Sequence, residues 1–154
     1  MPPQQLLFKP DGASDLGKNN RLVTILVVES DAAVREFAAT ILHDHGYEVI
    51  VESSGLAGLE TFRKHESGIT LIVTGIVMPE ITGVEMVRQV LTIAPSIKVV
   101  FMMGYSDSSL SEIDPREFAI LQKPFAAEAL LKAVHDCLSS NVAIRHIWRS
   151  VQHP

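Results

Sequence analysis

The sequence is poor in cysteine, with Cys137 the only one among 154 residues. A single cysteine excludes an internal disulfide framework and is typical of proteins in reducing compartments. No apolar run approaches the roughly 20 residues that a membrane-spanning helix needs. The first five residues also lack the basic stretch followed by an apolar one that marks a secretory signal. We therefore expect a cytoplasmic protein.

Clustered basic charge is missing as well. The chain has 13 Lys and Arg against 18 Asp and Glu, for a formal net charge of -5, and its basic residues are scattered. A nucleic-acid-binding protein usually carries a basic patch or stripe, so we expect neither nucleic acid nor a membrane among the partners. With 47% hydrophobic and 20% charged residues, the composition is ordinary for one folded domain.

The two ends of the chain differ from its middle. Residues 1–20 are interrupted by Pro2, Pro3, Pro10, Gly12 and Gly17, and we predict a flexible N-terminal arm. Residues 21–140 are predicted to form the domain. Residues 141–154 are predicted to be an amphipathic C-terminal extension, because apolar residues recur there at helical spacing between basic ones: Ile144, Ile147, Trp148 and Val151.

The apolar stripe of the C-terminal extension has two interpretations. It packs back on its own domain, or it docks on a partner or on a second copy of the chain to form a homodimer, with Trp148 as the anchor. The sequence leaves both open.

The middle segment alternates short apolar runs with stretches of helical period. The runs at 22–28, 47–51, 69–73, 97–103 and 118–121 have the length of strands, and residues 106–113 predict a short helix or an irregular turn. This alternation predicts an α/β fold with a doubly wound, five-stranded parallel sheet of flavodoxin-like topology. In such sheets ligands bind at the carboxyl ends of the strands.

The first predicted helix has recognisable ends. Asp31 precedes it as an N-cap and Gly46 follows it, while the apolar residues at helical spacing are expected to face the core: Val34, Phe37, Ala38, Ile41 and Leu42. Leu56, Leu59 and Phe62 mark the second helix by their spacing.

Four short segments carry a resemblance to a known family. They are residues 25–31, Met78-Pro79 with Gly83 four residues on, residues 99–107, and Lys123-Pro124-Phe125. In this order, at the ends of predicted strands, they resemble the receiver domains of response regulators over about residues 22–140, and are most similar to receivers of hybrid histidine kinases. The resemblance implies two-component (phosphorelay) signal transduction.

The resemblance also implies a phosphorylation site. In the family two adjacent acids after the first strand hold Mg²⁺, an aspartate after the third strand takes the phosphoryl group, and a Ser or Thr after the fourth reads it. A lysine before a proline completes the site. The ion and the lysine offset the charge that gathers on the transferring oxygens.

Carried over residue by residue, most of these roles are lost. The acid pair becomes Glu29 and Ser30, so Mg²⁺ binding is expected to be weak or absent; no other cofactor is implied. The phosphoacceptor position is Gly75 and the switch position is Met103, and only Lys123 is retained. Because glycine has no nucleophile, we predict a degenerate receiver, a pseudo-receiver that is not an enzyme and has no catalytic residue.

Two hypotheses follow for the function. The first is a phosphorylation-independent protein-interaction module that contacts a histidine kinase or another signalling protein around the fourth and fifth strands and the last helix. Its candidate contact residues are Tyr105, Ile120 and Trp148. The second is a Mg²⁺-dependent phosphoacceptor that uses an unconventional acid, Asp31 or Glu29. We expect Asp31 to cap its helix instead, and Lys123 to pair with Glu29 across the strand ends.

Overall fold

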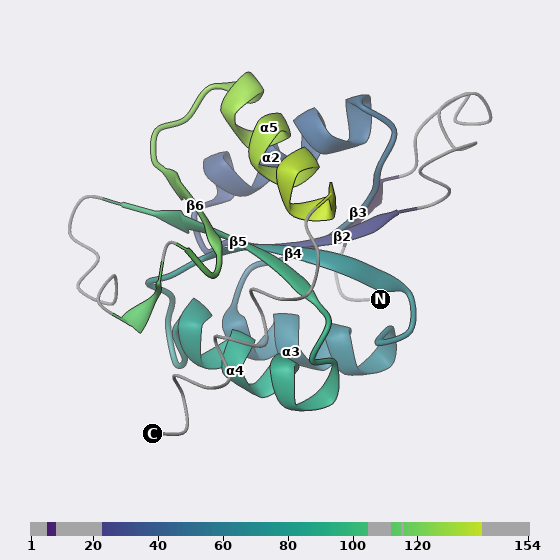
Figure 1. Cartoon of the computed structure of the whole chain (residues 1–154), viewed down its shortest axis with the longest axis vertical. Helices are drawn as coiled ribbons and strands as arrows, with labels where there is room; N and C mark the ends of the chain where they lie inside the picture. Colours follow the sequence, from purple (N-terminus) through teal and green to yellow (C-terminus); the bar gives the residue numbers. More distant parts are fainter. Residues whose placement is uncertain (1–5, 9–22, 105–111, 115, 140–154) are drawn as a thin grey trace.

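A computed structural model describes residues 6–8, 23–104, 112–114 and 116–139. Within these ranges the chain forms one sheet between two layers of helices, with α2 and α5 on one face and α3 and α4 on the other (Figure 1). The elements are β1 (Leu6–Phe8), β2 (Thr24–Val28), α2 (Ala32–Asp44), β3 (Glu48–Glu52), α3 (Gly55–Lys64), β4 (Ile69–Gly75), α4 (Gly83–Ile93), β5 (Lys98–Met103), β6 (Ala119–Gln122) and α5 (Ala127–Ser139).

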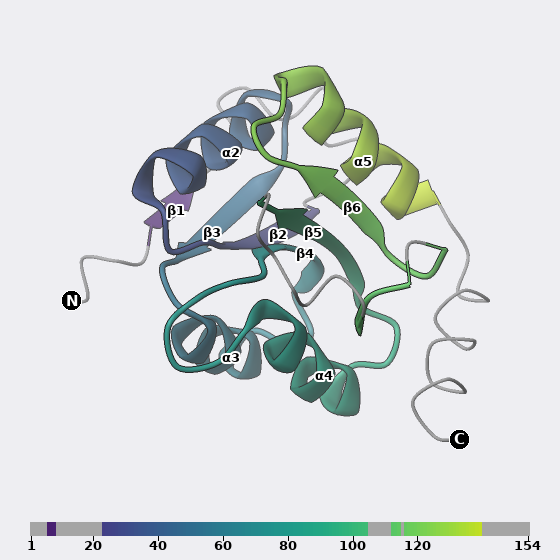
Figure 2. The same ribbon diagram turned by 90° about the vertical axis from the view of Figure 1, so that its left-hand side faces the viewer.

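The strand order of the sheet is β1-β3-β2-β4-β5-β6. Strands β3, β2, β4, β5 and β6 run parallel to one another. Numbered among themselves, these five follow the order 2-1-3-4-5 of doubly wound, flavodoxin-like sheets, with the two helical layers on opposite sides (Figure 2). The predicted fold class is confirmed.

Strand β1 was not predicted. It pairs antiparallel with the outer edge of β3, with Leu6 opposite Val51 and Phe8 opposite Val49. The prediction of a flexible arm over residues 1–20 therefore does not hold for residues 6–8, which cover an edge that would otherwise present unpaired backbone groups. The rest of the arm and the extension at 141–154 lie outside the described residues.

The parallel strands are apolar on both faces because each face carries a layer of helices. Leu26 and Val28 of β2 point into the core beneath α3 and α4, and Ile25 and Val27 into the core beneath α2 and α5; all four are fully buried. Each such side chain contributes roughly 1.5–3 kcal/mol to folding relative to full exposure. The sheet is therefore packed on both faces and forms the middle layer of the fold.

The ends of α2 follow the prediction, but one of its apolar residues does not. Oδ1 of Asp31 accepts hydrogen bonds from the amides of Ala33 and Val34, which confirms the N-cap, and Gly46 follows the helix with φ 96°. That backbone conformation favours glycine. Phe37, expected in the core, is 46% exposed, because it stands at the rim of the apolar stripe, beside the β6–α5 loop.

Candidate functional site

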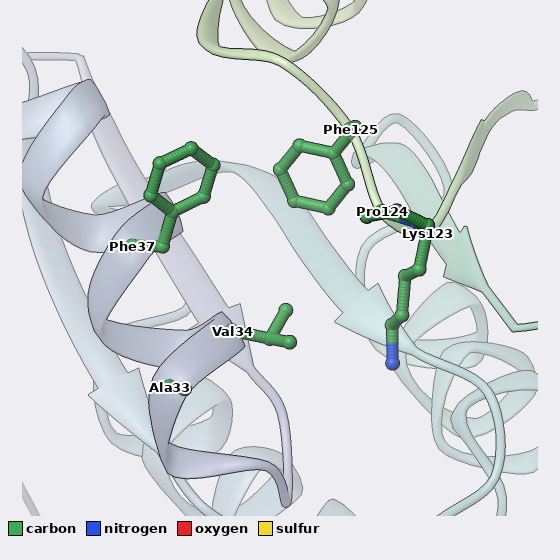
Figure 3. Close-up of a pocket in the computed structure, with 6 residues that line it drawn as sticks. All are labelled: Ala33, Val34, Phe37, Lys123, Pro124 and Phe125. Atoms are coloured by element: carbon green, nitrogen blue, oxygen red, sulfur yellow. The ribbon is translucent and has the colours of Figure 1, made fainter.

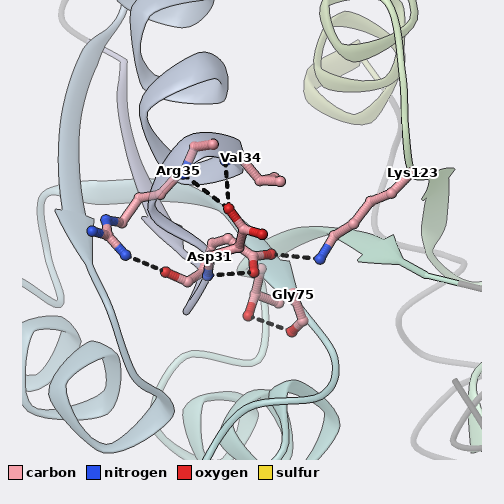
Figure 4. A network of polar contacts seen from close by, with 8 residues as sticks. Asp31, Val34, Arg35, Gly75 and Lys123 are labelled. Carbon is pink, nitrogen blue, oxygen red and sulfur yellow. Dashed lines mark hydrogen bonds and ion pairs between the residues drawn. The ribbon is translucent and has the colours of Figure 1, made fainter.

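The carboxyl ends of four neighbouring strands bring the expected site residues together. Glu29 directly follows β2, Gly75 ends β4, Met103 ends β5, and Lys123 follows β6. These strands are adjacent and parallel, so their ends meet at one edge of the sheet. Figure 4 shows Lys123 reaching across this edge toward the end of β4 and the start of α2.

Glu29 is the centre of the polar contacts at this edge. Its side chain is 1% exposed, and its Oε1 lies 2.9 Å from Nζ of Lys123. Oε1 has no well-directed hydrogen-bond donor, so the contact with the ammonium is an ion pair. The backbone N–H of Asp31 donates to Oε2 at 3.0 Å, and Arg35 donates to the Glu29 carbonyl at 2.7 Å. The predicted pairing of Lys123 with Glu29 is confirmed.

The Glu29 carboxylate also lies against Gly75. A Cβ built on Gly75 would stand 2.5 Å from Oε1 and 3.2 Å from Cδ of Glu29. On the other side, a Cβ on Gly83 at the start of α4 would overlap the Gly75 carbonyl oxygen. That oxygen also accepts a hydrogen bond from the Thr74 hydroxyl, at 2.8 Å. Gly75 is therefore enclosed on both sides, and the buried carboxylate stands where its side chain would begin.

A pocket that the sequence analysis missed lies next to this ion pair. It has a volume of about 380 Å³ and mostly apolar walls from α2 and from the β6–α5 loop: Ala33, Val34, Phe37, Lys123, Pro124 and Phe125. The rings of Phe37 and Phe125 lie side by side in its wall, tilted by 45° at a centroid distance of 5.8 Å (Figure 3). The exposure of Phe37 is explained by this position, which helical period alone does not distinguish from the core.

Residues 25–135 match the family described as response regulator receiver domain. The chain belongs to this family.

Three relatives illustrate the similarity of this receiver. The response regulator receiver protein CpdR of Brucella abortus is 33% identical over 116 residues, which cover 74% of this chain and 95% of CpdR. The sensor kinase CckA of the same organism is 31% identical over 132 residues, 84% of this chain but only 14% of CckA. The crystal structure of the receiver domain of hybrid histidine kinase CckA has a TM-score of 0.65 and 26% identity, covering 75% of this chain and 99% of that domain.

The residues at the acid-pair positions of this receiver do not fit a Mg²⁺ site. The Glu29 carboxylate is buried against an ammonium and a backbone amide, and Ser30 is exposed and neutral. The Asp31 carboxylate accepts from helix amides. Among the described residues, no three His, Cys, Asp or Glu side chains group closely enough to hold a metal ion. Mg²⁺ prefers several oxygen ligands in octahedral geometry, which this arrangement does not offer.

The remaining site candidates of the receiver have packing roles or lie outside the described residues. Met103 and Ile120 are partly buried and pack against the core beneath α3 and α4. The Met103 carbonyl accepts the backbone N–H of Lys123 at 2.8 Å. Tyr105 and Trp148 are outside the described residues.

None of the helices in the described part of the chain is long and apolar enough to cross a membrane.

Proposed function

We propose that this receiver acts without phosphorylation at position 75, as a protein-interaction module in two-component signalling. The observation that carries the proposal is the Glu29 carboxylate, which is buried over Gly75 and already paired with Lys123. Transfer of a phosphoryl group to a carboxylate needs a nucleophile, a divalent ion and a cation that is free to meet the transferred oxygens. Here the nucleophile is missing and the cation is engaged by another residue.

The residue at the switch position, Met103, supports the same conclusion. Met103 replaces the Ser or Thr that the family uses to read the phosphoryl group, and its side chain packs on the core. A thioether offers no hydroxyl to a phosphoryl oxygen. The conformation at the ends of β4 and β5 is therefore set by the sequence rather than by a phosphate, in the manner of a pseudo-receiver.

The partner we propose is another signalling protein, such as a histidine kinase, met in the cytoplasm around β5, β6 and α5. CckA, one of the relatives, is by name a sensor kinase. The pocket between α2 and the β6–α5 loop adds an apolar surface with exposed Phe37 on its rim. Apolar pockets with an aromatic anchor are typical of protein interfaces, and Ile120 of β6 stays a candidate contact.

The test is chemical. The full-length protein is incubated with acetyl phosphate or phosphoramidate, with and without Mg²⁺, beside a receiver that has aspartate at the position of Gly75, and intact masses are read. We expect the phosphoryl adduct only on the control receiver. A Mg²⁺-dependent adduct on this chain contradicts the proposal.

The second candidate function is phosphorylation of Glu29 itself. Its favouring observation is that Oε1 faces Lys123 and has no directed hydrogen-bond donor. Against it, Glu29 is 1% exposed, and a phosphoryl donor has to reach the attacking oxygen. Any adduct that appears is assigned with Glu29→Gln and Asp31→Asn: loss of the adduct in one variant alone identifies the acceptor.

Binding to a partner is tested separately, with the purified cytoplasmic part of a histidine kinase from the same organism. We expect an affinity that acetyl phosphate and Mg²⁺ leave unchanged and that Phe125→Ala weakens. Lys64→Ala, at the exposed end of α3 on the opposite face of the sheet, is the matched control. Binding that requires a phosphoryl donor counts against the module.

A further inference from the structure

We propose that the C-terminal extension, residues 141–154, returns to its own domain and places Trp148 in the apolar pocket between α2 and the β6–α5 loop, where it competes with a protein partner. The docking of Trp148 depends only on the pocket and on the sequence of the extension. The competition deepens the proposed function and rests on it, because it requires that a partner uses the same pocket.

The first argument is the pocket itself, which leaves aromatic surface exposed. Its volume of about 380 Å³ lies in the range of cavities that take a small organic group. Phe37 is 46% exposed, although its ring lies 5.8 Å from that of Phe125. Aromatic rings at such distances prefer tilted or offset contacts, and a third ring can join them in the same geometry. The indole of Trp148 suits this pocket because its body is apolar and its N–H can stay at the wet rim.

The second argument is the length of the chain after α5. This helix begins two residues after Phe125, so the pocket lies at its N-terminal end. Its 13 residues span roughly 20 Å. Trp148 is nine positions beyond Ser139, the last residue of α5, and nine extended residues reach about 30 Å. Ser140 and Asn141, which come first, are residues that favour turns. The extension is therefore long enough to reverse and bring Trp148 back to the pocket.

The third argument is charge complementarity. Arg145 precedes Trp148 by three positions and Arg149 follows it directly. On the domain, Glu36 of α2 and Glu128 in the first turn of α5 are both exposed. Within the described ranges neither of these carboxylates is in an ion pair. The helices that flank the pocket thus offer two carboxylates to the two arginines beside Trp148.

The cations near the pocket do not oppose a basic segment. Lys123 lines the wall with its stem, and its ammonium points away from Phe37 and Phe125 (Figure 3). That ammonium is already paired with Glu29, at 2.9 Å. The Arg35 guanidinium donates to the Glu29 carbonyl at 2.7 Å. Both positive charges are therefore engaged by the domain, and the pocket keeps an apolar wall with acidic helices around it.

The fourth argument selects the chain's own extension over that of a second copy. A short tether holds its end near a site on the same molecule at an effective concentration of about a millimolar. A second copy has to be present at a comparable concentration to compete. At lower protein concentrations the pocket therefore takes Trp148 of the same chain.

The test is the fluorescence of Trp148, the only tryptophan of the chain. In the full-length protein we expect emission at shorter wavelength and weaker quenching by acrylamide than in a synthetic peptide of residues 141–154. Phe37→Ala should return both quantities toward the peptide values, and Phe125→Ala repeats the test from the other wall. Leu56→Ala, 45% exposed on α3 at the opposite face of the sheet, is the matched control and should change neither. Urea unfolding verifies that the variants fold.

The charges are tested with Glu128→Lys. Glu85→Lys is its matched control, because Glu85 is also an exposed acid in the first turn of a helix, α4, on the other face of the sheet. Only Glu128→Lys should increase the quenching of Trp148. Added salt should increase it in the wild-type protein, because salt screens exposed charges.

Three results overturn the docking. The first is quenching of Trp148 as strong as in the free peptide. The second is protection that Phe37→Ala and Phe125→Ala leave unchanged, which places the indole elsewhere. The third is protection that is lost on dilution, together with a dimeric mass by light scattering, which assigns the pocket to Trp148 of a second copy.

The competition is measured with the same kinase preparation. Full-length Trp148→Ala should bind it more tightly than the wild-type chain does, because the pocket is then open. Weaker binding would make Trp148 an anchor for the partner and contradict the competition. If neither chain binds a partner, the proposed function fails, while the fluorescence of the isolated protein still decides the docking, so the two failures are distinguishable.

Discussion

Replacing Lys123 with methionine tests the role of the ion pair, because methionine keeps most of the stem that lines the pocket and removes the ammonium. Glu29 would then remain buried at 1% exposure with only the Asp31 amide as a partner for its carboxylate. Removing one partner of a buried ion pair typically costs 3–5 kcal/mol. Lys123 is 25% exposed, so water screens part of the attraction, and we expect a loss of about 2–4 kcal/mol.

The assay is urea unfolding of the full-length protein, with Lys132→Met as the control. Lys132 pairs with Asp136 at 2.7 Å, but both side chains are more than half exposed, and such i,i+4 pairs contribute only about 0.3–0.5 kcal/mol. Adding Glu29→Gln to Lys123→Met removes the buried charge and should restore part of the stability, as a double-mutant cycle measures. A loss under about 1 kcal/mol for Lys123→Met refutes the reasoning.

Three further outcomes are expected. Asp31→Ala removes the N-cap of α2 and should lower the free energy of unfolding, measured with urea, by about 1 kcal/mol. An unchanged unfolding midpoint would show that the cap does not contribute to stability. Phe62→Ala empties a fully buried position in α3 and should lower the free energy of unfolding by about 3–5 kcal/mol in the same assay. A decrease of less than about 1 kcal/mol would contradict this packing. Burial raises the pKa of Tyr47 above its usual 10.0, so the stability that its neutral phenol contributes is present below pH 10.0 and is lost as the pH rises through the raised value. Tyr47→Phe should weaken the alkaline loss of stability, and an identical pH profile for the variant would exclude this cause.

The fold was predictable because its signals are local and repeated. Strands buried on both faces appear in the sequence as continuous apolar runs, and Asp31 and Gly46 mark the ends of α2 through capping rules that depend on a few neighbouring residues. The contact between Lys123 and Glu29 was predictable for another reason: in a parallel sheet the carboxyl ends of strands meet at one edge, so the order of the motifs along the chain sufficed.

The features that escaped prediction depend on contacts between distant segments. Strand β1 has three residues, too few for a period, and its pairing depends on the free edge of β3. Phe37 has the spacing of a core residue, and only the position of the β6–α5 loop places it at a pocket. The sequence says that Gly75 lacks a side chain, but not that the buried Glu29 carboxylate lies against it.

This last point changes what the retained lysine means. A lysine kept at the end of β6 is easily taken as a sign that phosphoryl chemistry persists. Here Lys123 has a sufficient structural reason to be kept, because without it a carboxylate at 1% exposure would stand unpaired in the protein. Glu29 and Lys123 balance each other's charge at this edge of the sheet, beside a glycine that offers no nucleophile. The lysine alone is therefore no argument for phosphotransfer, and the stability of the Glu29 and Lys123 variants is a sharper test of this site than the presence of either residue.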